Sequence, residues 1–216
     1  NQTLEAFAQA LFKVWFISGM NKANRLAVGN LIDFNPKEKI SFQKEYLFFD
    51  MKCLSENSTV MSKGVKRKIK SASNFREGDT LMAKITPCLE NGKTGFVLDL
   101  DGEEVARGST EFIVMRAKEN CNPFFVYCLA RSENFRDFAI KSMTGTSGRQ
   151  RVQVDLLKNY QVDSSGERMG QFGRVCQPLF KKIKSNSLQL HILSTLRDML
   201  LPKLMRGEIR FTKNFQ

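Results

Sequence analysis

The chain has 216 residues, of which 42% are hydrophobic and 26% are charged, a composition typical of a folded protein rather than a disordered tail. Its 34 Lys and Arg against 22 Asp and Glu give a formal net charge of +12. This excess favours a polyanionic partner, with nucleic acid ahead of a membrane surface. Apolar runs such as residues 124–130 are too short to span a bilayer, and residues 1–10 do not have the pattern of a signal peptide.

The cysteines and the histidine argue against metal chemistry. The five cysteines are odd in number and form no C-x-x-C pair, and His191 is the only histidine. A structural zinc site and a disulfide framework are therefore both disfavoured, and a reducing cytoplasm fits best. We expect no metal and no cofactor. The cysteines are Cys53, Cys88, Cys121, Cys128 and Cys176.

The first predicted element is a helix over residues 1–18. Leu4, Phe7, Leu11, Val14 and Trp15 recur at steps of three and four, which predicts one apolar stripe on a helix ending near Ser18. A helix of this length is marginal alone in water, so it needs a partner helix.

The middle of the chain, up to about residue 165, has a mixed pattern. Strands are predicted at 46–51, 80–85, 95–100 and 110–116, with turns at 90–93 and 101–102. Asn122 and Pro123 provide an N-cap and an N1 proline for a helix running to about residue 141. A stretch rich in Gly, Ser and Thr, at 144–148, precedes a short strand at 151–154. The fold class predicted is α/β (α+β).

The third predicted element is one helix from about Glu167 to Met205. Such a helix is roughly 55 Å long, too long for this domain to cover, so it needs another helix alongside, and the two helical ends could pair antiparallel. Pro202 is expected to kink or end it, and Gly207 to stop it. A heptad seam, the predicted coiled-coil interface, comprises Phe172, Cys176, Leu179, Ile183, Asn186, Leu190, Leu193 and Leu200.

The sequence contains no complete catalytic motif. Residues 122–125 partly match the Asn-Pro-Pro-aromatic motif of amino-group DNA methyltransferases, but the second proline and a Gly-rich loop for a methyl donor are missing. The acidic groups at 50–52 and 99–104 lack the spacing of a metal-nuclease site and fit solvated turns. His191 fits a packed or rim position on the long helix. We expect a non-catalytic protein.

Three basic groups remain as candidates for DNA contacts: residues 61–70 with five basic residues and no acid, the group Lys84, Lys93 and Arg107, and the loop 144–151. Hydroxyls and glycine N–H groups suit phosphates, and Arg and Gln suit base edges. Solvated loops are the alternative. The phosphate candidates are Lys63, Lys66, Arg67 and Lys68, the base-edge candidates are Arg149, Gln150, Lys84, Thr86 and Lys93, and Thr146, Ser147 and Arg151 complete the set.

Three stretches resemble the specificity subunits of type I restriction-modification systems. Residues 1–16 (NQTLEAFAQALFKVWF) look like the end of their central conserved helix, and residues 200–209 (LLPKLMRGEI) look like the end of their C-terminal one. Residues 144–154 resemble the segment that closes their target recognition domains, and residues 109–112 fit a strand there.

The resemblance implies a division of the chain and a role. It places a conserved helix end at 1–18, a target recognition domain at 19–165, a coiled-coil helix at 166–207 and a tail at 208–216. In that family each recognition domain reads one half of a split double-stranded DNA target, and the conserved helices dock the methylation subunits. The restriction subunit joins the assembly, and the specificity subunit itself catalyses nothing.

This chain departs from the family pattern because it has one recognition domain. It is expected to be either a half-length subunit that forms a homodimer through the long helix or the C-terminal half of a full subunit, and Asn186 would help set the register of that dimer. Two alternatives stay open: a stand-alone DNA-modifying enzyme, and a coiled-coil scaffold without sequence specificity.

Overall fold

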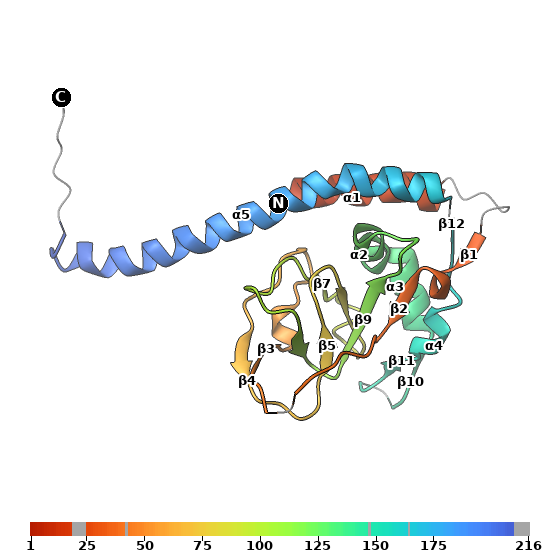
Figure 1. Cartoon of the computed structure of the whole chain (residues 1–216), viewed down its shortest axis with the longest axis horizontal. Coiled ribbons are helices and arrows are strands. Elements are labelled where there is room, and N and C mark those ends of the chain that lie inside the picture. The colour runs from red at the N-terminus through yellow and green to blue at the C-terminus, as the bar shows by residue number, and fades with distance from the viewer. Residues whose placement is uncertain (19–24, 42, 147, 164, 210–216) are drawn as a thin grey trace.

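The computed structural model describes residues 1–18, 25–41, 43–146, 148–163 and 165–209, in which one long helix extends from a mixed domain of helices and strands (Figure 1). The predicted fold class is confirmed. Within these described residues no helix is long and apolar enough to cross a membrane.

Two four-stranded sheets form the middle of the chain. The first is antiparallel, in the order β2 (Ile32–Phe34), β9 (Phe112–Ala117), β6 (Thr80–Ala83), β7 (Thr94–Phe96). The second has the order β4 (Val65–Arg67), β3 (Tyr46–Phe49), β8 (Ala106–Gly108), β5 (Ser73–Phe75), with β3 and β8 parallel. The predicted strands are confirmed as β3, β6, β7 and β9, although β7 ends at Phe96 rather than at Leu100.

Strand β9 separates two hydrophobic cores. Phe112 and Val114 belong to the core between the two sheets, whereas Ile113 and Met115 belong to the core that the helices cover. The two cores alternate along β9 because successive side chains of a strand point to opposite faces of the sheet. The second core connects the sheets to the helical layer.

Two helices follow β9 where one was predicted. Helix α2 (Pro123–Arg131) begins at Asn122, whose side chain accepts a hydrogen bond from the Phe125 amide at 2.8 Å, which confirms the predicted cap. A single helix to residue 141 is wrong, because Ser132 has an extended backbone and its hydroxyl caps α3 (Glu133–Lys141). Helix α2 is almost wholly buried between the first sheet and the helices at the chain ends.

The N-terminal helix is α1 (Gln2–Phe12), continued by the π-helical segment η1 (Lys13–Ser18). Its buried side chains include Ala8, Phe12 and Phe16, whereas Phe7 and Val14 are 54% and 61% exposed. The predicted apolar stripe is therefore wrong at those two positions. The extra residue per turn in the π-helical segment changes the phase of the helix after Phe12, so a constant step places Val14 on the wrong side.

A carboxylate lies on the buried face of α1. Glu5 accepts hydrogen bonds from the Thr59 amide, at 2.8 Å, and from the hydroxyl of Tyr127, and lies 3.7 Å from the guanidinium of Arg131. Burial first, and then the charge of Glu5, raises the pKa of Tyr127 well above its ordinary value. These contacts fix α1 to the domain.

The long helix α5 (Gly166–Met205) confirms the third predicted element. One face of its first half is buried against the domain. Helix α1 runs antiparallel beside this half: Asn186 donates to the Asn1 side chain at 3.0 Å at one end, and Arg168 donates to the Trp15 carbonyl at 3.4 Å at the other. The antiparallel pairing of the two helical ends is therefore confirmed. The buried residues of this half are Met169, Phe172, Cys176, Phe180 and Ile183.

The second half of α5, beyond Ser187, extends away from the domain with exposed leucines (Figure 1). The predicted seam therefore divides: Phe172, Cys176 and Ile183 are covered by this chain's own domain, whereas Leu190, Leu193 and Leu200 are exposed. Pro202 does not end the helix, which continues to Met205. The Gly207 amide then donates to the Leu204 carbonyl with a φ of +72°, as expected of a helix stop.

Shorter elements lie elsewhere in the described residues. Strand β1 (Arg25–Ala27) pairs with β12 (Gln161–Asp163), and β10 (Met143–Thr144) pairs with β11 (Arg151–Val152). The short helices are η3 (Val28–Asn30), η4 (Met51–Cys53) and α4 (Val154–Leu157).

Candidate nucleic-acid interface

The basic run at 61–70 forms the edge of the second sheet. Lys66 and Arg67 lie on β4, and Lys68 follows directly, all three being exposed. Arg67 lies over the Phe48 ring at 5.7 Å, and Lys66 lies 3.3 Å from Glu103. Lys63 is set apart, because it lines a groove between this sheet and α5 together with Lys184 and Leu188.

The loop rich in Gly, Ser and Thr is the tip of the β10–β11 hairpin. Gly145 and Gly148 have φ values of +126° and +78°, a backbone conformation that favours glycine. Thr146 and Arg149 are exposed there, whereas Ser147 lies outside the described residues. The hairpin therefore presents a hydroxyl and a guanidinium to solvent.

The base of this hairpin is fixed to the end of β6. The Thr86 amide donates to the Gln150 carbonyl and the Gln150 amide donates to the Thr86 hydroxyl, both at 3.2 Å, and the Val152 amide donates to the Lys84 carbonyl at 3.0 Å. Arg151 also belongs to this base, because it pairs with Ile85 in a β-bridge. The structure thus brings together five of the predicted residues: Lys84, Thr86, Arg149, Gln150 and Arg151. Thr86 is buried, so its part is to hold the hairpin rather than to reach a base.

Arg151 is held by an acid. Its guanidinium contacts both carboxylate oxygens of Glu111, the shortest distance being 2.7 Å. This hydrogen bonding lowers the pKa of Glu111 below its ordinary value. Arg151 is thereby engaged within the protein, and Arg149 is the exposed arginine at the tip of the hairpin.

The side chains of Lys93 and Arg107 have partners away from this hairpin. Lys93 is half-buried and its ammonium group donates to the Met51 carbonyl at 3.4 Å. Arg107 was expected beside the hairpins as a surface residue, but it is buried and donates to the carbonyls of Ile69 and Lys70. That expectation is wrong, since Arg107 ties the segment after β4 to the sheet.

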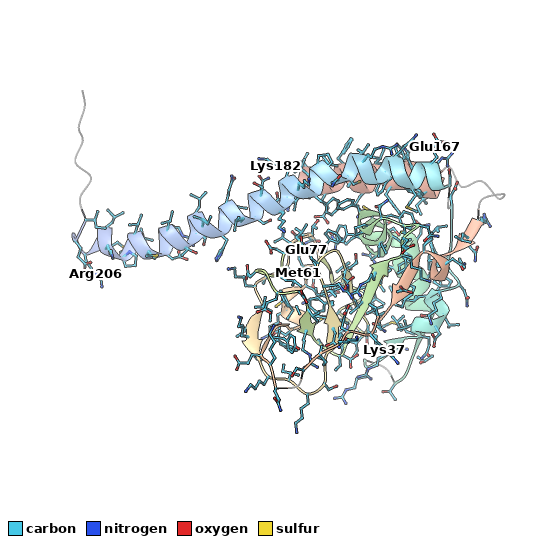
Figure 2. The ribbon with its side chains drawn as sticks, in the orientation of Figure 1. Lys37, Met61, Glu77, Glu167, Lys182 and Arg206 are labelled. Carbon is cyan, nitrogen blue, oxygen red and sulfur yellow. The ribbon has the colours of Figure 1, made fainter. Side chains whose placement is uncertain are left out.

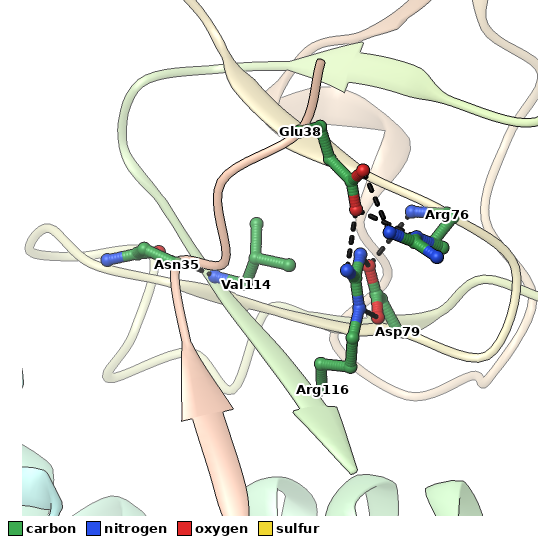
Figure 3. A network of polar contacts seen from close by, with 6 residues as sticks. All are labelled: Asn35, Glu38, Arg76, Asp79, Val114 and Arg116. Atoms are coloured by element: carbon green, nitrogen blue, oxygen red, sulfur yellow. Dashed lines mark hydrogen bonds and ion pairs between the residues drawn. The ribbon is translucent and has the colours of Figure 1, made fainter. Parts of the chain in front are cut away.

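A network of four charged side chains joins segments that are far apart in the sequence (Figure 3). Arg116 donates to both oxygens of Asp79, at 2.7 and 2.6 Å, and to Glu38 at 2.5 Å. Arg76 makes a two-point contact with Glu38, at 2.7 and 2.9 Å. Burial alone would raise the pKa of Glu38, but the hydrogen bonds from Arg76 and Arg116 outweigh it, and the pKa lies below its ordinary value. Sequence reasoning missed this network.

The residues that partly match enzyme motifs have structural partners. Asn122 uses its carbonyl oxygen in the α2 cap and its amide nitrogen to donate to the Met169 carbonyl at 2.8 Å. Asp50 accepts from the Lys52 amide at 2.8 Å in a turn. Among the described residues no group of three His, Cys, Asp or Glu side chains could hold a metal ion.

Sequence comparisons find specificity subunits of type I restriction enzymes. The EcoEI specificity subunit of Escherichia coli is 28% identical over 145 residues, 63% of this chain and 24% of that protein. The MjaIX specificity subunit of Methanocaldococcus jannaschii is 35% identical over 91 residues, 40% of this chain and 20% of that protein. No protein-family model matches the sequence.

Solved structures of type I restriction-modification S subunits have a similar fold. A type I restriction-modification S subunit from M. genitalium superposes with a TM-score of 0.57 at 14% identity, over 94% of this chain and 53% of that one. The HsdS subunit of Thermoanaerobacter tengcongensis gives 0.52 at 15% identity, over 96% and 52%. The resemblance to type I specificity subunits is thereby confirmed. The chain spans about a quarter of the curated relatives and about half of these structures.

Proposed function

We propose that the chain is a non-catalytic DNA-recognition subunit of a type I restriction-modification complex. Its recognition domain, residues 19–165, would read one half of a split double-stranded target without a cofactor. The observation that supports this most is the position of the basic segments: β4 and the β10–β11 hairpin both lie on the side of the domain away from α1 and α5 (Figure 1). A duplex could contact that side while α5 stays accessible to other subunits.

Affinity and specificity would come from different residues. Lys66, Arg67 and Lys68 are the proposed phosphate contacts, which supply affinity that falls steeply with salt. Arg149 and Gln150 at the hairpin are the proposed readers of base edges, because guanidinium and amide groups make two-point contacts with guanine and adenine. Thr146, Ser147, Lys84 and Arg151 would support them.

Alanine substitutions separate the two roles. Lys66→Ala is expected to weaken binding to every sequence alike and to reduce the salt slope by about 0.9. Arg149→Ala is expected to cost about 1–3 kcal/mol of discrimination at one base pair. Both are measured by titrating each variant against the preferred duplex and its single-base variants. Equal losses across all sequences for both variants would remove the base-reading role of Arg149.

The exposed half of α5 is the proposed interface for assembly. We propose that two copies pair through Leu190, Leu193 and Leu200, presenting two identical domains to a palindromic split site, and that the paired helices dock the methylation subunits and, through them, the restriction subunit. The protein would act in the cytoplasm. The exposed apolar side chains are the reason for this proposal, since a helix half of this kind is stable in water only when another helix covers it.

Asn186 lies on α5 beside the first residues of α1. It is bonded to Asn1 of its own chain, and a polar residue at such a seam position fixes register at a cost in stability. Asn186→Leu is therefore expected to yield a mixture of assemblies where the wild type gives one mass and one melting transition. Sedimentation equilibrium and thermal unfolding measure this. One mass and one transition for the variant would show that Asn186 does not set the register.

Enrichment of a random duplex library at about 150 mM salt, a concentration at which phosphate contacts are partly screened, tests the proposed function. It is performed with and without the methylation subunit. A gapped motif with two inverted, identical halves supports base reading by a symmetric dimer, and one ungapped half-site supports a single domain acting alone. If no sequence is enriched under either condition, the remaining interpretation is a coiled-coil scaffold without sequence specificity. Incubation with plasmid, Mg²⁺ and methyl donor tests for an activity of the chain's own.

A further inference from the structure

The segment between β2 and β3 presents two lysines on the outside of the domain. Residues 35–41 have no regular secondary structure, yet their exposure alternates: Lys37 and Lys39 are exposed, whereas Glu38 and Ile40 are half-buried. An extended backbone places successive side chains on opposite sides. Because Glu38 points inward to its two arginines, Lys37 and Lys39 lie on the outer side.

The segment is held at three points. The Asn35 side chain accepts from the Val114 amide at 2.9 Å, and the Asn35 amide donates to the Val114 carbonyl at 2.7 Å. Glu38 accepts from both Arg76 and Arg116 (Figure 3). The Ser41 amide donates to the Tyr46 hydroxyl at 2.9 Å. A loop fixed in this way loses little conformational entropy when its lysines contact a ligand.

A shared carboxylate links the chain just after this segment with the basic edge strand β4. Glu103 contacts Lys44 at 2.9 Å and Lys66 of β4 at 3.3 Å, so the chain just after the segment and the proposed phosphate contacts share one carboxylate. Hydrogen bonds from Lys44 and then Lys66 lower the pKa of Glu103. Lys37 lies on the side of the domain opposite to Lys182 of α5 (Figure 2).

We infer that Lys37 and Lys39 are further phosphate contacts of the DNA-binding surface, and that Glu38 is the positioning residue that holds them outward. This inference rests on the proposed function. It assigns a role to a segment in which Lys37-Glu38-Lys39 carries charges of both signs and therefore has no basic run in its sequence.

The test is the salt dependence of binding to a fluorescent duplex of mixed sequence, about 30 base pairs long, because phosphate contacts do not depend on sequence. The variant Lys37→Gln/Lys39→Gln is compared with Lys181→Gln/Lys182→Gln, which removes two exposed lysines from α5. The first is expected to make the log–log salt slope shallower by about 2 and to raise the Kd at 150 mM salt roughly fivefold for each lysine replaced. The second is expected to change neither.

Glu38→Gln separates the positioning role of Glu38 from its charge, because the two predict opposite changes in affinity for the duplex. The substitution makes the protein more positive, so simple electrostatics predicts tighter binding, whereas loss of positioning predicts a weaker affinity and a shallower slope. Circular dichroism below the melting temperature checks that the variant is folded, and the lysine variants, being at exposed positions, carry the test if it is not.

The outcomes distinguish the inference from the proposed function. If the wild type does not bind the duplex, either alone or with the methylation subunit, the proposed function fails and the inference with it. If the wild type binds with a steep salt slope but the two lysine pairs behave alike, the inference alone is overturned. Tighter binding by folded Glu38→Gln would overturn the positioning role.

Discussion

Phe172→Ala is expected to lower the free energy of unfolding by about 3–5 kcal/mol, as truncation of a large buried side chain does. Phe172 is fully buried, and its ring meets those of Phe12, Trp15 and Phe16 at centroid distances of 6.1, 6.2 and 5.4 Å. These aromatic contacts join α5 to the N-terminal helix. The cavity left by alanine would open the helical layer that covers the first sheet.

A matched control lies on the same helix. Leu193 is 61% exposed, so Leu193→Ala is expected to change the unfolding free energy by less than about 0.5 kcal/mol. Both variants are measured by urea denaturation followed by circular dichroism, at one low protein concentration, because any association through α5 would add a concentration-dependent contribution. Similar small losses for the two variants would contradict the division of α5 into a buried and an exposed half.

That division shows what helical periodicity can and cannot predict. The spacing of apolar residues predicted the existence of α5, because a step of three and four defines one face wherever it occurs. It could not say what covers that face. Phe172 and Leu193 occupy the same kind of seam position, yet only Phe172 is covered within this chain, where its ring meets aromatic rings of the N-terminal helix. The partner of a helix is decided by tertiary packing, which the local pattern does not contain.

The N-terminal helix illustrates a different difficulty. Large apolar residues such as Phe7 and Val14 were expected inside, but the buried positions include Ala8 and the carboxylate of Glu5. A small residue permits close approach of helices, and Glu5 is buried because Tyr127 and the Thr59 amide provide its hydrogen bonds. Hydrophobicity alone cannot identify a polar group whose partners come from distant parts of the chain.

The candidate interface, too, could be predicted from the sequence only in part. The basic run at 61–70 and the loop rich in Gly, Ser and Thr were predicted as candidate DNA contacts, because each is encoded within about ten consecutive residues as glycines, hydroxyls or lysines. That the first forms an edge strand and the second the tip of a hairpin was not predicted. Lys37 and Lys39 were not predicted as contacts, because their outward position depends on Glu38 meeting Arg76 and Arg116, which follow much later in the chain. Local composition predicts local surfaces, whereas an ion network requires the fold.

Arg116→Leu is expected to be the other strongly destabilising change, at about 3–5 kcal/mol, since removing one partner of a buried ion pair leaves an uncompensated charge. The side chains of Asp79 and Glu38 are only 1% and 7% exposed. Urea denaturation at neutral pH measures the loss. Arg197→Leu is the control, because Arg197 is exposed and pairs only with its neighbour Asp198 among the ion pairs of the described chain, and it is expected to change stability by less than about 0.5 kcal/mol.

The same network predicts a dependence on pH. The pKa of Glu38 is lower in the folded protein than its ordinary value of 4.5, so its contribution to stability is present above pH 4.5 and is lost as the pH falls through the folded value. The difference in unfolding free energy between wild type and Glu38→Gln should therefore be constant near neutral pH and shrink below pH 4.5. A difference that stays constant into the acid range would mean that ionised Glu38 does not stabilise the segment carrying Lys37 and Lys39.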